Sequence, residues 1–266
     1  MATIYSMKGE KTGTIKLGKV FSFPLREGLI KRAVIASQAN RRQKYGADKL
    51  AGLRTSAHYH GSSQVYPHAR MAGRGMARLP RIHGQGPLLF IAREASQTVK
   101  GRKSHAPVAE RNFTKTMNKK EKKLALYSAL SASVNKELVL KRGHKIEKIK
   151  EVPLIVDDEL MKLKKTKEMV SVLNSLGLKE ELKRGKEKII RAGKGTTRGR
   201  KYKRKKSALI IISEKCDLQK TARNIPGIEI SIVKELNVEK LAPGNHPGRL
   251  TVFTKSAVEQ LNKLEL

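Results

Sequence analysis

The chain of 266 residues carries 58 Lys and Arg against 23 Asp and Glu, which gives a formal net charge of +35. Self-repulsion of this size opposes a compact state unless a polyanion supplies counter-charge. A nucleic-acid backbone does so with release of condensed counterions. An anionic membrane is the rival polyanion, but no stretch approaches the roughly 20 apolar residues of a membrane span.

Two further features of the sequence indicate the cellular compartment of the protein. The N-terminal residues show no apolar signal region. The single cysteine, Cys216, excludes an internal disulfide framework and a cysteine-based zinc site. We therefore expect a cytoplasmic protein that does not enter a membrane.

The N-terminal part predicts two strands and a helix. Residues 2–6 and 13–17 have the pattern of short strands around a glycine-containing turn. A helix is expected after Pro24, because apolar residues recur at helical spacing on one face, and this pattern ends at Tyr45. A second helix is expected from Asn118, where Glu121 three residues later suits a capping box.

Between these helices, residues 46–112 contain almost nothing that could build a core. They hold 8 of the 21 glycines, 4 of the 9 prolines and 5 of the 7 histidines, with 11 Lys or Arg against Asp48, Glu94 and Glu110. A stretch this long without regular structure is uncommon inside a compact domain and marks function or disorder. We interpret it as an extended loop that leaves the globular body, is ordered by nucleic acid, and returns.

The C-terminal half alternates strands with helices. Strands are predicted at residues 154–156, 208–212, 228–233 and 250–253. Helices are predicted from Thr166 with Gly177 as C-cap, over residues 217–223, after Asn237, and from Ser256 with Glu259 completing a capping box. Asp157, Asp158 and Glu159 suit an acidic helix start. This alternation predicts one α/β domain over residues 1–266 with a mostly parallel sheet flanked by helices, and residues 46–112 inserted in it.

A second basic block covers residues 183–206, with 13 Lys or Arg and only Glu187 as an acid. Glycine lets a backbone approach a ligand closely, and Lys and Arg neutralise phosphates. The alternative interpretation is a solvated charged linker. Because the chain has two such blocks, we favour this alternative less.

Signals for enzymatic or metal chemistry are weak. The run from Gly193 to Gly199 resembles a nucleotide loop, but it precedes a predicted strand rather than following one. His58 and His60 lack the further ligands that a metal site needs. Cys216 has no nameable catalytic partner. We expect no enzyme, no cofactor and no metal.

Within the first basic segment, Arg70, Arg74, Arg78 and Arg81 recur every three or four residues around Gly73 and Gly75. Extended, this tract would thread between phosphates; helical, it would present one basic face. Tyr59, Tyr66 and the histidines offer stacking faces for unpaired bases, the usual targets in RNA recognition.

Two other functions remain open on these residues. An RNA-modifying enzyme on an α/β sheet would need a cofactor loop after a strand, and none is found. A non-specific architectural DNA protein would bind through charge alone, so equal affinity for duplex DNA and RNA at one salt concentration would favour it.

Four segments, in order, carry a resemblance to a known family. They are Ala51-Gly-Leu-Arg-Thr-Ser56, Val99-Lys-Gly-Arg-Lys-Ser-His-Ala-Pro107, Arg191-Ala-Gly-Lys-Gly-Thr-Thr-Arg-Gly-Arg200, and Ala222-Arg-Asn-Ile-Pro-Gly227 with Leu241-Ala-Pro-Gly-Asn-His-Pro-Gly-Arg249. Together they span most of the chain, and the chain resembles the large-subunit ribosomal protein four family, in its archaeal and eukaryotic branch.

The resemblance implies a structural constituent of the large ribosomal subunit. It implies an α/β body on the outer face of the subunit and a loop that runs through ribosomal RNA to line and constrict the nascent-peptide exit tunnel. The implied partners are large-subunit ribosomal RNA, neighbouring ribosomal proteins including the one that shares the tunnel constriction, and the passing nascent polypeptide. A homo-oligomer is not expected.

By family order the loop tip falls between about Tyr66 and Gly86, although this sequence departs from the family pattern at residues 59–67, so which residue faces the tunnel is left open. The expected tip residues are Tyr66, His68, Arg70, Met71, Gly73, Arg74, Gly75, Arg78, Arg81 and His83. The expected RNA-binding residues of the loop are Lys49, Arg54, Arg70, Arg74, Arg78, Arg81, Arg93, Lys100, Arg102 and Lys103. Those of the second block are Arg184, Lys186, Arg191, Lys194, Arg198, Arg200, Lys201, Lys203, Arg204, Lys205 and Lys206.

Overall fold

The computed structural model describes residues 1–59, 71–82 and 86–264. The chain divides into two compact units. The body consists of Met1–Arg41 together with Thr114–Leu266, and the basic segment is Arg42–Phe113.

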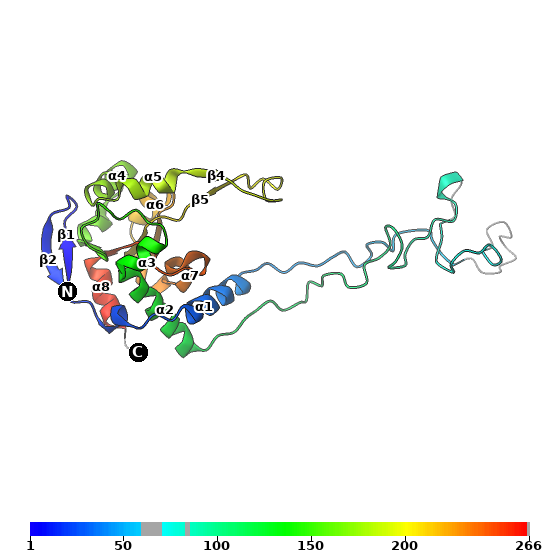
Figure 1. Ribbon diagram of the computed structural model, residues 1–266, viewed down its shortest axis with the longest axis horizontal. Coiled ribbons are helices and arrows are strands. Elements are labelled where there is room, and N and C mark those ends of the chain that lie inside the picture. The colour runs from blue at the N-terminus through cyan, green and yellow to red at the C-terminus, as the bar shows by residue number, and fades with distance from the viewer. Residues whose placement is uncertain (60–70, 83–85, 265–266) are drawn as a thin grey trace. The chain divides into compact units, whose positions relative to one another are not determined.

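A six-stranded sheet forms the centre of the body, in the order β2-β1-β3-β8-β6-β7. Its edge pair β1 and β2 is labelled in Figure 1. The strands are β1 Ala2–Tyr5, β2 Lys11–Ile15, β3 Leu154–Val156, β6 Leu209–Ile212, β7 Glu229–Ile232 and β8 Thr251–Thr254. All neighbouring pairs are parallel except β1 and β2. The prediction of an α/β fold with a mostly parallel sheet is therefore confirmed.

Helices cover both faces of this sheet because successive side chains of a buried strand point in opposite directions. On one face, Leu209, Ile211 and Phe253 share a buried cluster with residues of α1 and α2. On the other, Ile210, Ile212 and Val252 pack in a cluster with residues of α4 and α6. The helices are α1 Glu27–Asn40, α2 Lys119–Val134, α3 Lys136–Lys141, α4 Thr166–Ser175, α5 Lys179–Lys186, α6 Leu218–Arg223, α7 Val238–Leu241 and α8 Lys255–Asn262.

The helix ends test the capping predictions. Gly177 ends α4 with a φ of +86°, and Leu178 N donates to Leu173 O at 3.0 Å, which is the Schellman pattern that a C-terminal glycine permits. Asp157 caps the 3-10 helix Asp158–Lys162 by accepting from Asp158 N at 2.8 Å. Both predictions are confirmed.

The two predicted capping boxes do not form. Asn118 precedes α2 but makes no capping bond through its side chain, and Glu121 pairs with Arg32 of α1 at 3.2 Å instead. Ser256 lies inside α8, and its hydroxyl donates to Asp158 Oδ1 at 2.7 Å. In both places a charged group from another element is a stronger partner than the local backbone.

Sequence periodicity missed several short elements and shifted one. The strand expected at residues 13–17 lies at Lys11–Ile15, where it pairs with β1. Helices α3 and α5 were not predicted, and neither was the antiparallel hairpin of β4 Lys188–Ile190 and β5 Tyr202–Arg204 inside the second basic block. These pieces are too short and too rich in Lys for a period to emerge.

The chain leaves and re-enters the body at neighbouring points. Helices α1 and α2 pack in one apolar cluster, and Asn40 Oδ1 accepts a hydrogen bond from Lys115 N at 2.8 Å. The two ends of the body thus meet in a direct contact, and the described part of the basic segment contributes no strand or helix to the body.

Across the described ranges, none of the helices combines the length and apolar character that crossing a bilayer requires.

Candidate nucleic-acid interface

The basic segment has very little core of its own. Among its described residues, only Ala57 and Met71 are buried apolar side chains. Its regular structure there amounts to a 3-10 turn at Gly86–Leu88 and isolated bridges that join Arg81 to His58 and Ala92. Burial on this scale cannot offset the entropy of ordering some 70 residues.

Backbone contacts hold the two arms of the basic segment together near its ends. Ala47 N donates to Pro107 O at 2.9 Å. Gly52 has a φ of +83°, and a Cβ there would lie 2.6 Å from the backbone of Gly101. A side chain at position 52 would therefore be strained and would also push the arms apart.

An aromatic and basic cluster lies at the ends of the segment. The rings of Tyr45 and Phe113 stack with centroids 5.9 Å apart. The guanidinium of Arg42 lies 4.4 Å from the Phe113 ring centroid, and that of Arg111 lies 5.4 Å from it. Such cation–π contacts order exposed side chains without a hydrophobic core.

Two arginines that we expected to bind RNA are engaged inside the segment. Arg81 is half-buried and donates through its guanidinium to Phe90 O at 2.7 Å and Ala77 O at 2.9 Å. Arg93 donates to Val99 O at 2.7 Å. These bonds to carbonyls position the turns, because each guanidinium ties together residues that make few other contacts.

The predicted tip is only partly described. Tyr66, His68, Arg70 and His83 lie outside the described residues. Met71 is buried, so within the segment it is a packing residue. Gly73 and Gly75 are exposed with positive φ. Arg74 and Arg78 are exposed, and the Arg74 guanidinium lies 4.8 Å from the Phe90 ring.

The remaining predicted cations of the segment lie at its surface. Arg54 pairs with Asp48 at 2.7 Å but is 67% exposed. The exposed predicted residues of the segment are Lys49, Arg54, Arg74, Arg78, Lys100, Arg102 and Lys103.

The second basic block forms a hairpin with no packed side. β4 and β5 pair from Lys188 with Arg204 to Ile190 with Tyr202, and every side chain of both strands is exposed. Arg200 N donates to Gly195 O at 2.9 Å, which closes the turn. The exposed predicted cations of this block are Lys186, Arg191, Lys194, Arg198, Arg200, Lys201, Lys203, Arg204 and Lys206. A hairpin this basic presents a nearly uniform positive surface.

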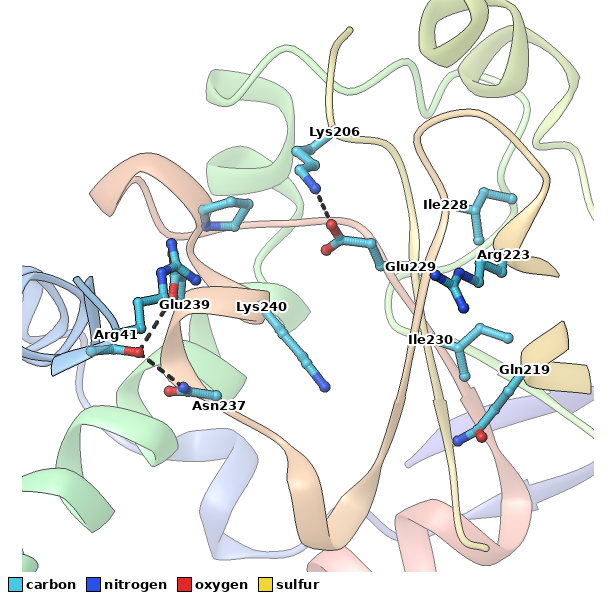
Figure 2. A pocket seen from close by; sticks show the side chains of 12 residues that line it. Arg41, Lys206, Gln219, Arg223, Ile228, Glu229, Ile230, Asn237, Glu239 and Lys240 are labelled. Atoms are coloured by element: carbon cyan, nitrogen blue, oxygen red, sulfur yellow. Dashed lines mark hydrogen bonds and ion pairs between the residues drawn. The ribbon is translucent and has the colours of Figure 1, made fainter. Parts of the chain in front are cut away.

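The hairpin returns to the body through ion pairs. Lys205 pairs with Glu187 at 3.0 Å, and Lys206 pairs with Glu229 at the start of β7 (Figure 2). Glu229 also accepts from the fully buried Arg249 at 2.6 Å. Burial would raise the pKa of Glu229, but the charges of Arg249 and Lys206 lower it below its ordinary value.

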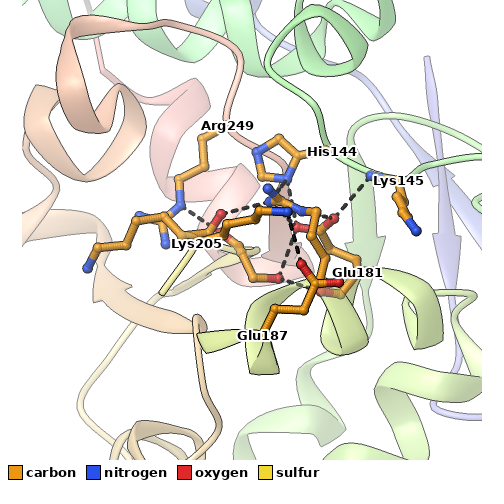
Figure 3. Close-up of polar contacts among 9 residues, drawn as sticks. His144, Lys145, Glu181, Glu187, Lys205 and Arg249 are labelled. Atoms are coloured by element: carbon orange, nitrogen blue, oxygen red, sulfur yellow. Dashed lines mark hydrogen bonds and ion pairs between the residues drawn. The ribbon is translucent and has the colours of Figure 1, made fainter. Parts of the chain in front are cut away.

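Arg184, which the sequence predicts to bind RNA, is instead part of a buried network at the base of the hairpin. Its partners Glu181 and His144 are labelled in Figure 3. Its guanidinium donates to both oxygens of Glu181, at 2.9 and 2.6 Å, and to Lys206 O at 2.8 Å. We therefore remove Arg184 from the candidate RNA-binding residues. Helical spacing from Glu181 was the available signal, since i and i+3 residues are neighbours on a helix.

Glu181 and His144 complete this network, and no sequence motif marks either residue. His144 Nδ1 lies 2.8 Å from Glu181 Oε1 and donates to it, since an ionised carboxylate only accepts. Burial, only partly opposed by Glu181, lowers the pKa of His144 below 6.5. Burial would raise the pKa of Glu181, but hydrogen bonds from His144 and Arg184 bring it down to about 2. The two residues lie 37 positions apart, so no local pattern could have paired them.

Within the described ranges, the candidate catalytic and metal groups do not converge on a site. His58 is exposed, and His60 lies outside the described residues. No group of three or more potential metal ligands occurs in the part of the chain that the structure describes. Burial raises the pKa of the half-buried Cys216 thiol, which opposes a nucleophilic role.

Comparison with known proteins gives one consistent family. The sequence profile of the ribosomal protein L4/L1 family matches residues 15–264. The large ribosomal subunit protein uL4 of Haloquadratum walsbyi is 46% identical over 260 residues, covering 97% of this chain and 98% of that protein. The uL4 proteins of Methanococcoides burtonii and Methanopyrus kandleri are 45% and 44% identical, over 100% and 98% of this chain and 99% and 98% of theirs.

Both the profile and the relatives extend over nearly the whole chain, so they include the body, the basic segment and the hairpin. The chain belongs to the ribosomal protein L4/L1 family.

Proposed function

We propose that this protein is a structural constituent of the large ribosomal subunit and acts there, in the cytoplasm, by binding ribosomal RNA. Relatives that match it almost end to end are large-subunit proteins. The observation that carries the RNA-binding part is that two exposed basic surfaces, the basic segment and the hairpin, have almost no core of their own. A phosphate backbone supplies the counter-charge and the contacts that each surface lacks.

The proposed RNA-binding residues are the exposed cations of these two surfaces. In the basic segment they are Lys49, Arg54, Arg74, Arg78, Lys100, Arg102 and Lys103, with Arg70 retained from the sequence. In the hairpin block they are Lys186, Arg191, Lys194, Arg198, Arg200, Lys201, Lys203, Arg204 and Lys206, with the partly buried Lys205 retained from the sequence. Arg81 and Arg93 contribute by holding the turns that present their neighbours.

We further propose that residues 46–112 form the inserted loop whose tip lines and helps constrict the nascent-peptide exit tunnel. This rests on the family and on the closure of the body behind the segment by the Asn40 and Lys115 contact. The partners would be ribosomal RNA, the neighbouring protein at the constriction and the passing nascent chain. Structural binding, with no catalytic step, accounts for every group described above.

The test is incorporation into large subunits of an archaeal host that carries a tagged copy. The wild-type chain should co-sediment with the large subunit after a high-salt wash. Reversing three hairpin charges, with Lys194→Glu, Arg198→Glu and Arg200→Glu, should reduce incorporation at least tenfold, because each lost phosphate contact weakens binding.

The matched control reverses three exposed lysines of the body outside both basic surfaces, Lys8, Lys16 and Lys263. It changes the net charge equally and should incorporate nearly as well as wild type. Equal loss in both variants would mean that net charge alone drives binding, and absence of the wild-type chain from washed subunits would refute the ribosomal assignment.

A further inference from the structure

Among the strands of the described residues, β7 lies at the end of the sheet and pairs with β6 alone. Glu229 N donates to Ala208 O at 3.3 Å, so the backbone of Glu229 faces β6. In a parallel ladder alternate residues face opposite sides, which directs the N–H and C=O of Ile230 away from the sheet. An edge of this kind is a template for another strand.

A cleft of about 900 Å³ lies along this edge (Figure 2). Gln219 and Arg223 of α6 form one wall, and Asn237, Glu239 and Lys240, at and around α7, form the other. Ile228 and Ile230 of the β7 region contribute apolar surface between these walls. The edge is therefore accessible from a groove that has room for an extended chain.

The strand edge of the cleft favours a peptide over RNA, because its outward backbone groups pair with another peptide backbone. Beside that edge the lining carries the cations Arg41, Lys206, Arg223 and Lys240 and two carboxylates, Glu229 and Glu239. Both are already paired, Glu229 with Lys206 and Arg249, and Glu239 with Arg41 at 2.6 Å.

Two cations of the cleft have no carboxylate partner among the described residues. Arg223 is exposed, and Lys240 donates to the neutral hydroxyl of Ser231 at 3.0 Å. An extended segment with an acidic side chain would meet these two cations while its backbone pairs with Ile230.

We propose that β7 docks an extended, carboxylate-bearing segment of a neighbouring large-subunit protein as an added strand. This rests on the proposed function, because the neighbour belongs to the same subunit. Backbone pairing supplies the affinity, and Arg223 and Lys240 select the acidic side chain.

The test uses purified large subunits that contain the chain with a photo-crosslinking amino acid in place of Gln219. Irradiation should join position 219 to a peptide of another ribosomal protein that carries Asp or Glu. An adduct with ribosomal RNA or with a second copy of this chain would overturn the proposal, as would no adduct in subunits that contain the chain. A chain absent from the subunits would instead refute the proposed function and this inference with it.

Two substitutions in the crosslinker chain sharpen the result. Ile230→Pro removes an outward N–H and spares the ladder with β6, so it should lower adduct yield at least tenfold while the chain still co-sediments. Arg223→Glu, on the surface of α6, should lower the yield several-fold. Unchanged yield in both variants would overturn the proposal, and Ser231→Pro, which breaks the ladder itself, should instead unfold the body.

Discussion

The body and the basic segment are stabilised by different interactions, although they belong to one chain. The body buries two clusters of apolar side chains on the two faces of its sheet. The basic segment buries only Ala57 and Met71 among its described residues, and joins its arms by backbone bonds and cation–π contacts. The hydrophobic effect thus stabilises the body in water, whereas the segment depends on a partner to supply counter-charge.

This difference predicts that the two parts respond separately to damage. A change in the body should alter the free energy of unfolding with or without RNA. A change in the segment should leave unfolding of the body alone and appear in subunit assembly. Damage confined to one part therefore shows whether the two parts are independent.

Deleting residues 57–90 should leave a folded body and nearly abolish incorporation into large subunits. Lys115 N donates to Asn40 Oδ1 where the segment joins the body. The deletion leaves this contact and residues 42–56 and 91–113 of the segment in place. Circular dichroism and thermal melting of the RNA-free chain would report the body, and gradient sedimentation would report assembly. An unfolded body would show that the segment is part of the fold after all.

Glu181→Gln should destabilise the body by about 3–5 kcal/mol, because it leaves the buried Arg184 guanidinium without a counter-charge. Urea unfolding of the RNA-free chain measures this change. The adjacent Glu180→Gln is the matched control, since Glu180 meets Lys148 at 2.8 Å at the surface and should barely move the midpoint. Similar losses in both variants would contradict the buried network.

Acid should weaken the body in two steps. The pKa of His144 is lowered below 6.5, so the unfolded chain takes up a proton first as the pH falls through about 6.5, and stability begins to decline there. The pKa of Glu181 is lowered from 4.5 to about 2, so stability present above 4.5 is lost towards pH 2. The Glu181 step amounts to on the order of 3 kcal/mol.

Urea unfolding across this pH range measures both steps. His144→Gln should remove the step near 6.5, whereas His246→Gln, at an exposed histidine, should keep it. A pH profile in which the two variants coincide would rule out His144 as its source.

Gly52→Ala should impair incorporation several-fold without changing the melting of the body. A Cβ at position 52 would lie 2.6 Å from the backbone of Gly101 and force the arms apart. Gly73→Ala is the matched control, because Gly73 also has a positive φ, of +79°, but no atom lies within 4 Å of its Cβ position. It should show only the backbone penalty of about 1–2 kcal/mol, and therefore a smaller defect.

Much of the sheet could be predicted because its strands are continuous apolar runs. Residues 209–212 are buried on both faces, which is what Leu-Ile-Ile-Ile indicates in a parallel sheet. The glycine that ends helix α4, Gly177, was equally predictable, since a left-handed residue at a helix end is usually glycine and sometimes Asn. Local chemistry of this kind does not depend on what the chain meets elsewhere.

The failures involve either partners that only folding brings together or elements too short to show a period. Ser256 and Glu121 fit capping boxes locally but bind Asp158 and Arg32 instead. Arg184 lies in a basic run that predicts an RNA ligand, yet Glu181 and His144 bury it. Periodicity could not separate a basic hairpin from a charged linker, because neither has an apolar face.

The sequence by itself determined the fold class, the basic character and the family, because apolar periodicity, net charge and ordered motifs are written locally along the chain. Only the tertiary structure decided which cations are available and which are structural. It removed Arg184 from the candidate interface, engaged Arg81 and Arg93 in turns, and left β7 with a free edge beside a cleft. The physical reason is that burial and pairing arise only when folding brings residues together, whether they lie 3 positions apart, as Arg184 and Glu181 do, or 40 apart, as Arg184 and His144 do.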